Sequence, residues 1–231
     1  MGAQPANAGN FTVTASGTQV KLHYSAGTPL TATGSASPST MTRNQSTLLA
    51  ITVTPGTSPA STGITVTADL TPIGGSAAQV FYDDGTHGDV AGGDGTYSFS
   101  APVAPNTAVG NLSINASATD AQTRIVTPTI ALSVVTGSLT WNGGGADDNW
   151  SSNPNWSGGS APGYAGDTLT FAGATRLTPN MEANYSVTDV TFDGSAGSFV
   201  IGATGSALPL PGRGLKPSSA NAQTLNVPVL A

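Results

Sequence analysis

Four aspartates in one glycine-rich loop are the residues best suited to chemistry in this sequence. Asp83, Asp84, Asp89 and Asp94 are four of the twelve acidic residues of the chain and lie within a short segment. Ca²⁺ takes about six to eight oxygen ligands from carboxylates, backbone carbonyls and water. Glycines between the aspartates permit the tight bends that such a loop requires. The pattern predicts a structural Ca²⁺ site with these four carboxylates as ligands.

The same loop has a second interpretation that involves no metal. Its spacing differs from that of an EF-hand, and no bidentate Glu closes it, so an EF-hand is excluded. Asp residues commonly accept a hydrogen bond from the backbone two residues further on, and Asp-Gly pairs are frequent in turns. The four aspartates can therefore be turn residues, and the sequence leaves both interpretations open.

The three tryptophans form the second candidate site. Trp141, Trp150 and Trp156 lie close together in the sequence, with Asn and Asp beside them. Flat aromatic rings flanked by hydrogen-bonding side chains suit carbohydrate binding. The alternative is that the indoles cover the open end of a β-structure, because an exposed end needs protection against edge pairing and large aromatics can supply it.

No catalytic set stands out in the sequence. The two histidines, His23 and His87, can each be matched with one of many serines and aspartates, so such a match has no weight. No Gly-x-Ser-x-Gly motif is present between a strand and a helix. Glu182 is the only glutamate, and the aspartates cluster in turns, which gives no carboxylate pair for glycoside hydrolysis. We expect a protein that is not an enzyme.

Composition restricts both the fold and the partners. Charged residues make up 8% of the chain, against roughly 25% in ordinary domains. Six basic residues against twelve acidic ones exclude a binder that holds nucleic acid by electrostatic attraction. No apolar run is long enough for a transmembrane helix, and the absence of cysteine excludes disulfides. Asp, Asn, Gly and Ser favour turns over helices, so we expect an all-β chain.

Alternating apolar residues indicate where the strands lie. Residues 11–24 alternate on both sides of Gly17, which predicts a hairpin. Residues 25–47 show no strong period and suggest a linker or an irregular edge. About seven short alternating runs follow up to Val135, the spacing of an immunoglobulin-like sandwich. Shorter runs separated by Gly and Pro continue to an apolar run, Leu225 to Leu230, which we expect to continue in a longer parent protein or to pair with another chain.

Two segments are similar to known bacterial families. The segment from Ser46 to Val135 resembles an Ig-like module of large secreted and surface-anchored proteins. The segment from Leu139 to Ala231 resembles the N-terminal part of the autotransporter-associated β-strand repeat proteins. The first resemblance rests on Ser46-Thr47-Leu48-Leu49, Val53-Thr54-Pro55-Gly56, the run from Phe81 to Asp89 and Gly93-Asp94-Gly95-Thr96-Tyr97. The second rests on Trp141-Asn142-Gly143-Gly144, Asp148-Asn149-Trp150, Asn155-Trp156, Pro162, the run from Gly166 to Phe171 and Val190-Thr191-Phe192.

These resemblances imply a fold and a role. They imply an Ig-like β-sandwich at 45–136 and the start of a β-helix or β-roll at 138–231, and the residue pattern places an arm with a hairpin and linker at 1–44 before them. They also imply a spacer, display or adhesive segment of a bacterial surface or secreted protein, located outside the cell. Its partners would be other copies of itself or the rest of a longer surface protein. Two alternatives are a carbohydrate-binding region of a secreted hydrolase, with glycans as partners, and a filament subunit assembled by β-strand exchange.

Overall fold

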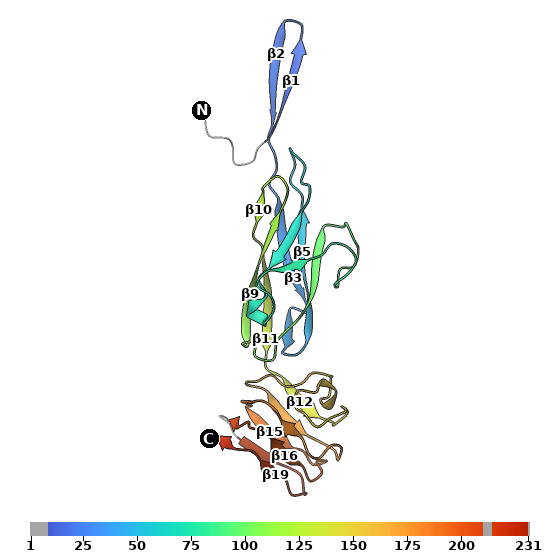
Figure 1. The fold of residues 1–231 in the computed structure, drawn as a ribbon, viewed down its shortest axis with the longest axis vertical. Coiled ribbons are helices and arrows are strands. Elements are labelled where there is room, and N and C mark those ends of the chain that lie inside the picture. Colours follow the sequence, from blue (N-terminus) through green and yellow to red (C-terminus); the bar gives the residue numbers. More distant parts are fainter. Residues whose placement is uncertain (1–8, 210–213, 231) are drawn as a thin grey trace.

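The protein is described by a computed structural model, which covers residues 9–209 and 214–230. Its regular structure is almost entirely β, with two short 3-10 turns, which confirms the predicted all-β class. Three units follow one another along the long axis of the molecule: a hairpin, a β-sandwich-like unit and a C-terminal unit (Figure 1). In the described part of the chain no helix has the length and apolar character needed to cross a membrane.

The N-terminal hairpin consists of β1 (Asn10–Ser16) and β2 (Gln19–Ser25), paired antiparallel. Gly17 begins the turn with a φ of 62°, a left-handed conformation that glycine adopts without strain. Every position of both strands is exposed, and the hairpin projects beyond the sandwich (Figure 1). The hairpin is therefore present where the sequence predicted it, but it does not pack against the sandwich.

Two sheets form the middle unit. One has the order β3-β5-β8, and the other has the order β4-β11-β9-β6-β7 with β10 added to β9. The 3-10 turn η1 (Thr71–Ile73) lies between β6 and β7. The strands are β3 (Thr31–Ser37), β4 (Thr40–Thr42), β5 (Ser46–Thr54), β6 (Thr65–Ala68), β7 (Gln79–Phe81), β8 (Thr96–Pro102), β9 (Gly110–Thr119), β10 (Ile125–Val126) and β11 (Thr129–Val135).

The core of this unit follows from the alternation in the sequence. In β5, Leu49, Ile51 and Val53 are buried, whereas Thr52 between them is exposed. Successive side chains of a strand point to opposite faces of the sheet. Alternate apolar residues of β6, β9 and β11 are buried in the same core cluster. Period-two patterning thus places one apolar layer between the two sheets.

The N-terminal boundary of the middle unit differs from the prediction. Residues 25–47 were expected to form a linker or an irregular edge; β3 pairs antiparallel with β5 and β4 pairs parallel with β11, each at the edge of its sheet. The apolar residues of β3 are Ala32 and Ala36, which give little hydrophobic signal although both pack against the core. A Cβ on Gly34 would lie 2.4 Å from the carbonyl oxygen of Thr129, so glycine lets β3 approach β11 closely.

The C-terminal unit consists of strands that pair in parallel. Its sheets have the orders β12-β13-β15-β18, β14-β16-β19 and β17-β20. The turn η2 (Asn153–Asn155) lies in the long connection between β12 and β13. The strands are β12 (Ser138–Trp141), β13 (Thr168–Phe171), β14 (Asn180–Met181), β15 (Asp189–Phe192), β16 (Val200–Ala203), β17 (Leu208–Pro209), β18 (Gly214–Pro217), β19 (Thr224–Asn226) and β20 (Val229–Leu230).

Stacking of similar side chains holds these parallel strands in register. Trp141 lies opposite Phe171, which lies opposite Phe192 on the next strand. The rings of Phe171 and Phe192 are stacked, with centroids 5.4 Å apart. Two residues earlier along the same strands, Leu169 lies opposite Val190 in the same way. The short apolar runs of the sequence therefore form columns of buried side chains.

Candidate functional site

The acidic loop connects β7 to β8 and brings three of its four aspartates together. One carboxylate oxygen from each of Asp83, Asp89 and Asp94 lies within 4.8 Å of the others. Asp89 is buried, whereas Asp94 is exposed. Asp84 is not a member of this group, so the structure gathers three of the four predicted ligands.

Asp84 stabilises a turn. Its Oδ1 accepts hydrogen bonds from the backbone N–H of Thr86, at 2.9 Å, and from the Thr86 hydroxyl, at 2.6 Å. The hydroxyl bond is the main reason why the pKa of Asp84 is lowered from its ordinary value. The neighbouring His87 stacks on Tyr82, with ring centroids 3.9 Å apart. These contacts are those of an ordered loop.

The three clustered carboxylates also accept backbone hydrogen bonds. Asp83 accepts from Gly93, at 2.7 Å, and from Gly95, at 3.1 Å. Asp89 accepts from the N–H of Gly85 at 2.7 Å, and Asp94 accepts from the N–H of Thr96 two residues on. The turn interpretation therefore accounts for much of the loop. Ca²⁺ binding by the three gathered carboxylates stays a prediction.

The three tryptophans are part of the C-terminal core. Trp141 and Trp150 are 0% exposed and Trp156 is 1% exposed. Trp156 packs edge-on against both of the other indoles and donates its Nε1–H to the carbonyl oxygen of Trp150 at 2.7 Å. No indole offers a ring face to a sugar in this arrangement. The predicted ligand-binding role does not fit these positions, which are those of packing residues.

A buried ion pair joins the sandwich to the C-terminal unit. Arg43, just after β4, contacts Asp167, just before β13, with Nη2 and Oδ1 2.7 Å apart. Both side chains are 3% exposed. Asp167 also accepts the backbone N–H groups of Gly137 and Gly163, each at 2.7 Å, and Arg43 donates to the carbonyl of Ala165. Both carboxylate oxygens are thus satisfied, as a buried charge requires.

Further hydrogen bonds surround this pair and cross the same interface. Asn44 donates to the carbonyls of Ala161 and Pro162, each at 3.0 Å. The Ser160 hydroxyl donates to the carbonyl oxygen of Arg43 at 3.1 Å. The backbone N–H of Tyr164 donates to the carbonyl oxygen of Pro105 at 2.9 Å. We name the contacts of Arg43 and Asn44 with residues 160–167 the Arg43 joint. These bonds connect the sandwich to the C-terminal unit at several points.

A pocket of about 360 Å³ lies beside the Arg43 joint. It is lined by Arg43, residues 105–109 and residues 164–166. Thr107 borders it with a buried hydroxyl that has no hydrogen-bond partner within the protein. Because an unpaired buried hydroxyl is costly, we expect ordered water in this pocket.

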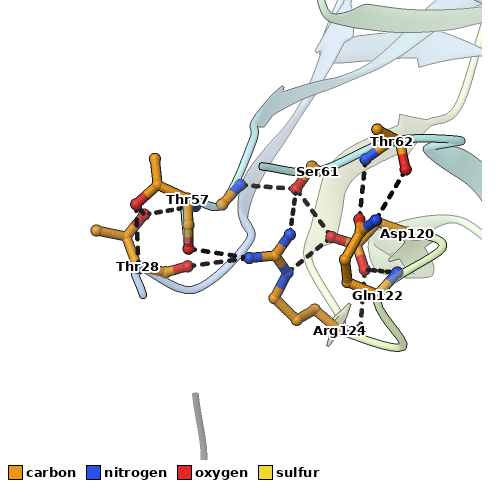
Figure 2. Close-up of polar contacts among 8 residues, drawn as sticks. Thr28, Thr57, Ser61, Thr62, Asp120, Gln122 and Arg124 are labelled. Atoms are coloured by element: carbon orange, nitrogen blue, oxygen red, sulfur yellow. Dashed lines mark hydrogen bonds and ion pairs between the residues drawn. The ribbon is translucent and has the colours of Figure 1, made fainter. Parts of the chain in front are cut away.

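A second polar cluster, the Arg124 hub, lies at the opposite end of the sandwich. Figure 2 shows the Arg124 guanidinium between Asp120 and Ser61 on one side and Thr28 and Thr57 on the other. Nε donates to Asp120 at 2.7 Å and Nη2 donates to Ser61 at 3.0 Å. Nη1 donates to the carbonyls of Thr28 and Thr57, each at 3.4 Å. The hub therefore fastens the segment that follows the hairpin to two loops of the sandwich.

Hydrogen bonds set the ionisation of Asp120. Burial alone would raise its pKa, but bonds from the Ser61 hydroxyl and from the backbone and side chain of Arg124 together hold the pKa below its ordinary value. The pKa of Asp148 is lowered in the same direction by Thr178 and Arg176. Both carboxylates therefore accept hydrogen bonds from an arginine and a neighbouring hydroxyl.

Sequence reasoning singled out neither the joint nor the hub. The signal was the rarity of cations: the chain has six Lys and Arg residues, and each arginine in the described ranges pairs with an aspartate. The partners of Arg43 are more than a hundred positions away in the sequence, so spacing could not reveal them. Comparison with family models, curated proteins and solved structures found no match to this chain.

Proposed function

We propose that this chain is a non-enzymatic extracellular spacer segment of a bacterial surface or secreted protein. The observation that carries the proposal is the Arg43 joint, which fixes two β-units one after the other along the long axis (Figure 1). Interfaces between domains permit relative motion by default unless they are large and hydrophobic, so in this proposal the ion pair and hydrogen bonds of the joint supply the restraint. A buried ion pair at the junction, whose two carboxylate oxygens both accept hydrogen bonds, suits a segment whose task is to hold distance and direction.

Within this proposal, the C-terminal unit is the start of a β-helix or β-roll. The pairings between its named strands in the described residues are parallel, and four strands, β12, β13, β15 and β18, stack in register. Stacked parallel strands bury a continuous core in which each turn covers the previous one. Such a unit extends length without requiring a larger cross-section, which is useful in a spacer. The sandwich in front of it is proposed to be Ig-like.

The carbohydrate-binding alternative loses its main support because the three indoles are buried. The spacer proposal is tested by small-angle X-ray scattering on the purified chain at low concentration, with the Arg43→Ala variant alongside. We expect an extended particle whose scattering fits one rigid arrangement, and a variant that fits only a mixture of arrangements. A wild-type chain that itself requires a mixture would contradict the proposal.

A further inference from the structure

One face of the projecting hairpin is entirely apolar. Directly opposite residues of an antiparallel pair lie on the same face, and successive residues alternate between faces. The register therefore sorts the hairpin into two chemically distinct sides. The apolar face carries Phe11 opposite Tyr24, Val13 opposite Leu22 and Ala15 opposite Val20, whereas the polar face carries Thr12 opposite His23 and Thr14 opposite Lys21.

This apolar face is open to solvent. The exposed fractions are 60% for Phe11, 67% for Val13, 75% for Val20 and 65% for Leu22. A two-stranded hairpin alone is at best marginally stable in water, and it needs a further layer against its apolar side. Contiguous exposed apolar patches mark interaction sites. The hairpin thus has the chemistry of one half of a small sandwich.

We propose that the hairpin face binds the same face of a second copy of this chain, with the two hairpins running in opposite directions. The face tapers: Phe11 and Tyr24 lie at the base, with ring centroids 5.0 Å apart, and Ala15 lies near the tip. Opposite directions place the large base pair of one copy over the small tip of the other. Val13 and Leu22 then meet their own counterparts at the two-fold axis, which gives an isologous interface.

The shape of the molecule permits this arrangement. The hairpin extends beyond the end of the sandwich (Figure 1), so two copies joined in this way have their larger units at opposite ends. Aromatic side chains bury on the order of 200 Å² each. Two faces together bury on the order of 1,000 Å², which is near the lower limit for a specific interface. The charged Lys21 lies on the polar face, so no charge is buried.

The inference rests on the hairpin alone and goes beyond the spacer proposal, which concerns the junction of the other two units. Its test is molar mass by size exclusion with multi-angle light scattering over a series of protein concentrations. We expect a concentration-dependent dimer for the wild type and a monomer for Val13→Asp. The matched control is Thr14→Asp, which adds the same charge at the next position on the polar face and should leave the dimer intact.

A monomeric wild type throughout the concentration series would overturn the proposal. A dimer that persists in Val13→Asp would also overturn it and would assign the association to the strand edges or to another unit. Equal dissociation of both variants would show that charge or hairpin unfolding is responsible, which overturns the apolar face as the cause.

Cross-linking tests the direction of pairing, and the absence of cysteine from the chain makes single cysteines unambiguous. Leu22→Cys lies at the proposed two-fold axis and should form a disulfide-linked dimer rapidly under mild oxidation. Ala15→Cys lies near the tip, far from its counterpart, and should not. Rapid cross-linking of Ala15→Cys would overturn the opposite-direction arrangement. Because cysteine adds no charge, this test also holds if the charged variants lower the stability of the hairpin.

Discussion

Arg43 and Asp167 carry opposite charges into an interface where both side chains are 3% exposed. Removing two charges from water costs several kcal/mol per ion, so such a pair contributes little net stability over an apolar contact. The pair instead favours one relative orientation of the two units, because a guanidinium and a carboxylate form hydrogen bonds in few geometries. In a chain with 8% charged residues, we interpret this pair as a device that sets the angle between two units.

Loss of one partner of this pair should be costly. Arg43→Ala leaves the Asp167 charge buried with only backbone donors, and we expect a loss of about 3 kcal/mol in the free energy of unfolding. The control is Lys216→Ala, which removes the exposed partner of Asp189 and should cost less than about 1 kcal/mol. Urea denaturation of both variants measures the difference. Equal losses would show that burial of the Arg43 joint has no energetic consequence.

Acid should destabilise the protein through its anchored aspartates. The pKa values of Asp84, Asp120 and Asp148 are lowered in the folded state, so near those values the unfolded chain binds more protons. Stability is then fully present above the unfolded pKa, about 4, and falls as the pH drops below it. We expect Tm to decrease between pH 5 and about pH 3, and Asp120→Asn to reduce that slope. If Tm of Asp120→Asn falls with pH as steeply as that of the wild type, the Asp120 carboxylate does not contribute to the acid sensitivity.

At the scale of elements, the sequence predicted strands best where large apolar residues alternate. Leu49, Ile51 and Val53 identified β5, whereas Ala32 and Ala36 did not reveal β3, because small residues give a weak hydrophobic period although both pack against the core. The acidic loop was found from Asp spacing, but which aspartates converge depends on the course of the loop. That course depends on backbone hydrogen bonds such as Gly93 to Asp83, which no sequence pattern specifies.

The calcium prediction is tested on this loop by thermal unfolding. A ligand that binds only the folded state must stabilise it, so added Ca²⁺ should raise Tm by several degrees if the three gathered carboxylates hold the ion. Asp89→Asn should abolish the rise. Asp84→Asn is the control, because Asp84 lies outside the gathered group and should leave the rise intact. An unchanged wild-type Tm would end the prediction.

The tryptophans should behave as core residues. Trp156→Ala empties a fully packed site and removes the hydrogen bond to Trp150, so we expect a loss of about 3–5 kcal/mol. Trp156→Phe keeps an aromatic ring and should lose less. Chemical denaturation followed by tryptophan fluorescence measures both. If Trp156→Ala is as stable as the wild type but migrates differently from it on a polysaccharide gel, the carbohydrate hypothesis is restored.

At the scale of the whole molecule, each end of the sandwich is fastened by a different arginine. The Arg124 hub contacts the segment next to the hairpin, and the Arg43 joint contacts the C-terminal unit. Both consist of an arginine–aspartate ion pair and further hydrogen bonds that involve neighbouring side chains.

The distribution of distances across the Arg43 joint tests the central claim most directly. Single-molecule energy transfer between dyes on Ala60→Cys and Ala220→Cys, both at exposed positions of an otherwise cysteine-free chain, reports that distance. The rigid spacer predicts one narrow distribution in the wild type and a broad one after Arg43→Ala. A broad distribution in the wild type, or an equally narrow one in the variant, would contradict the claim that this joint sets the direction of the molecule.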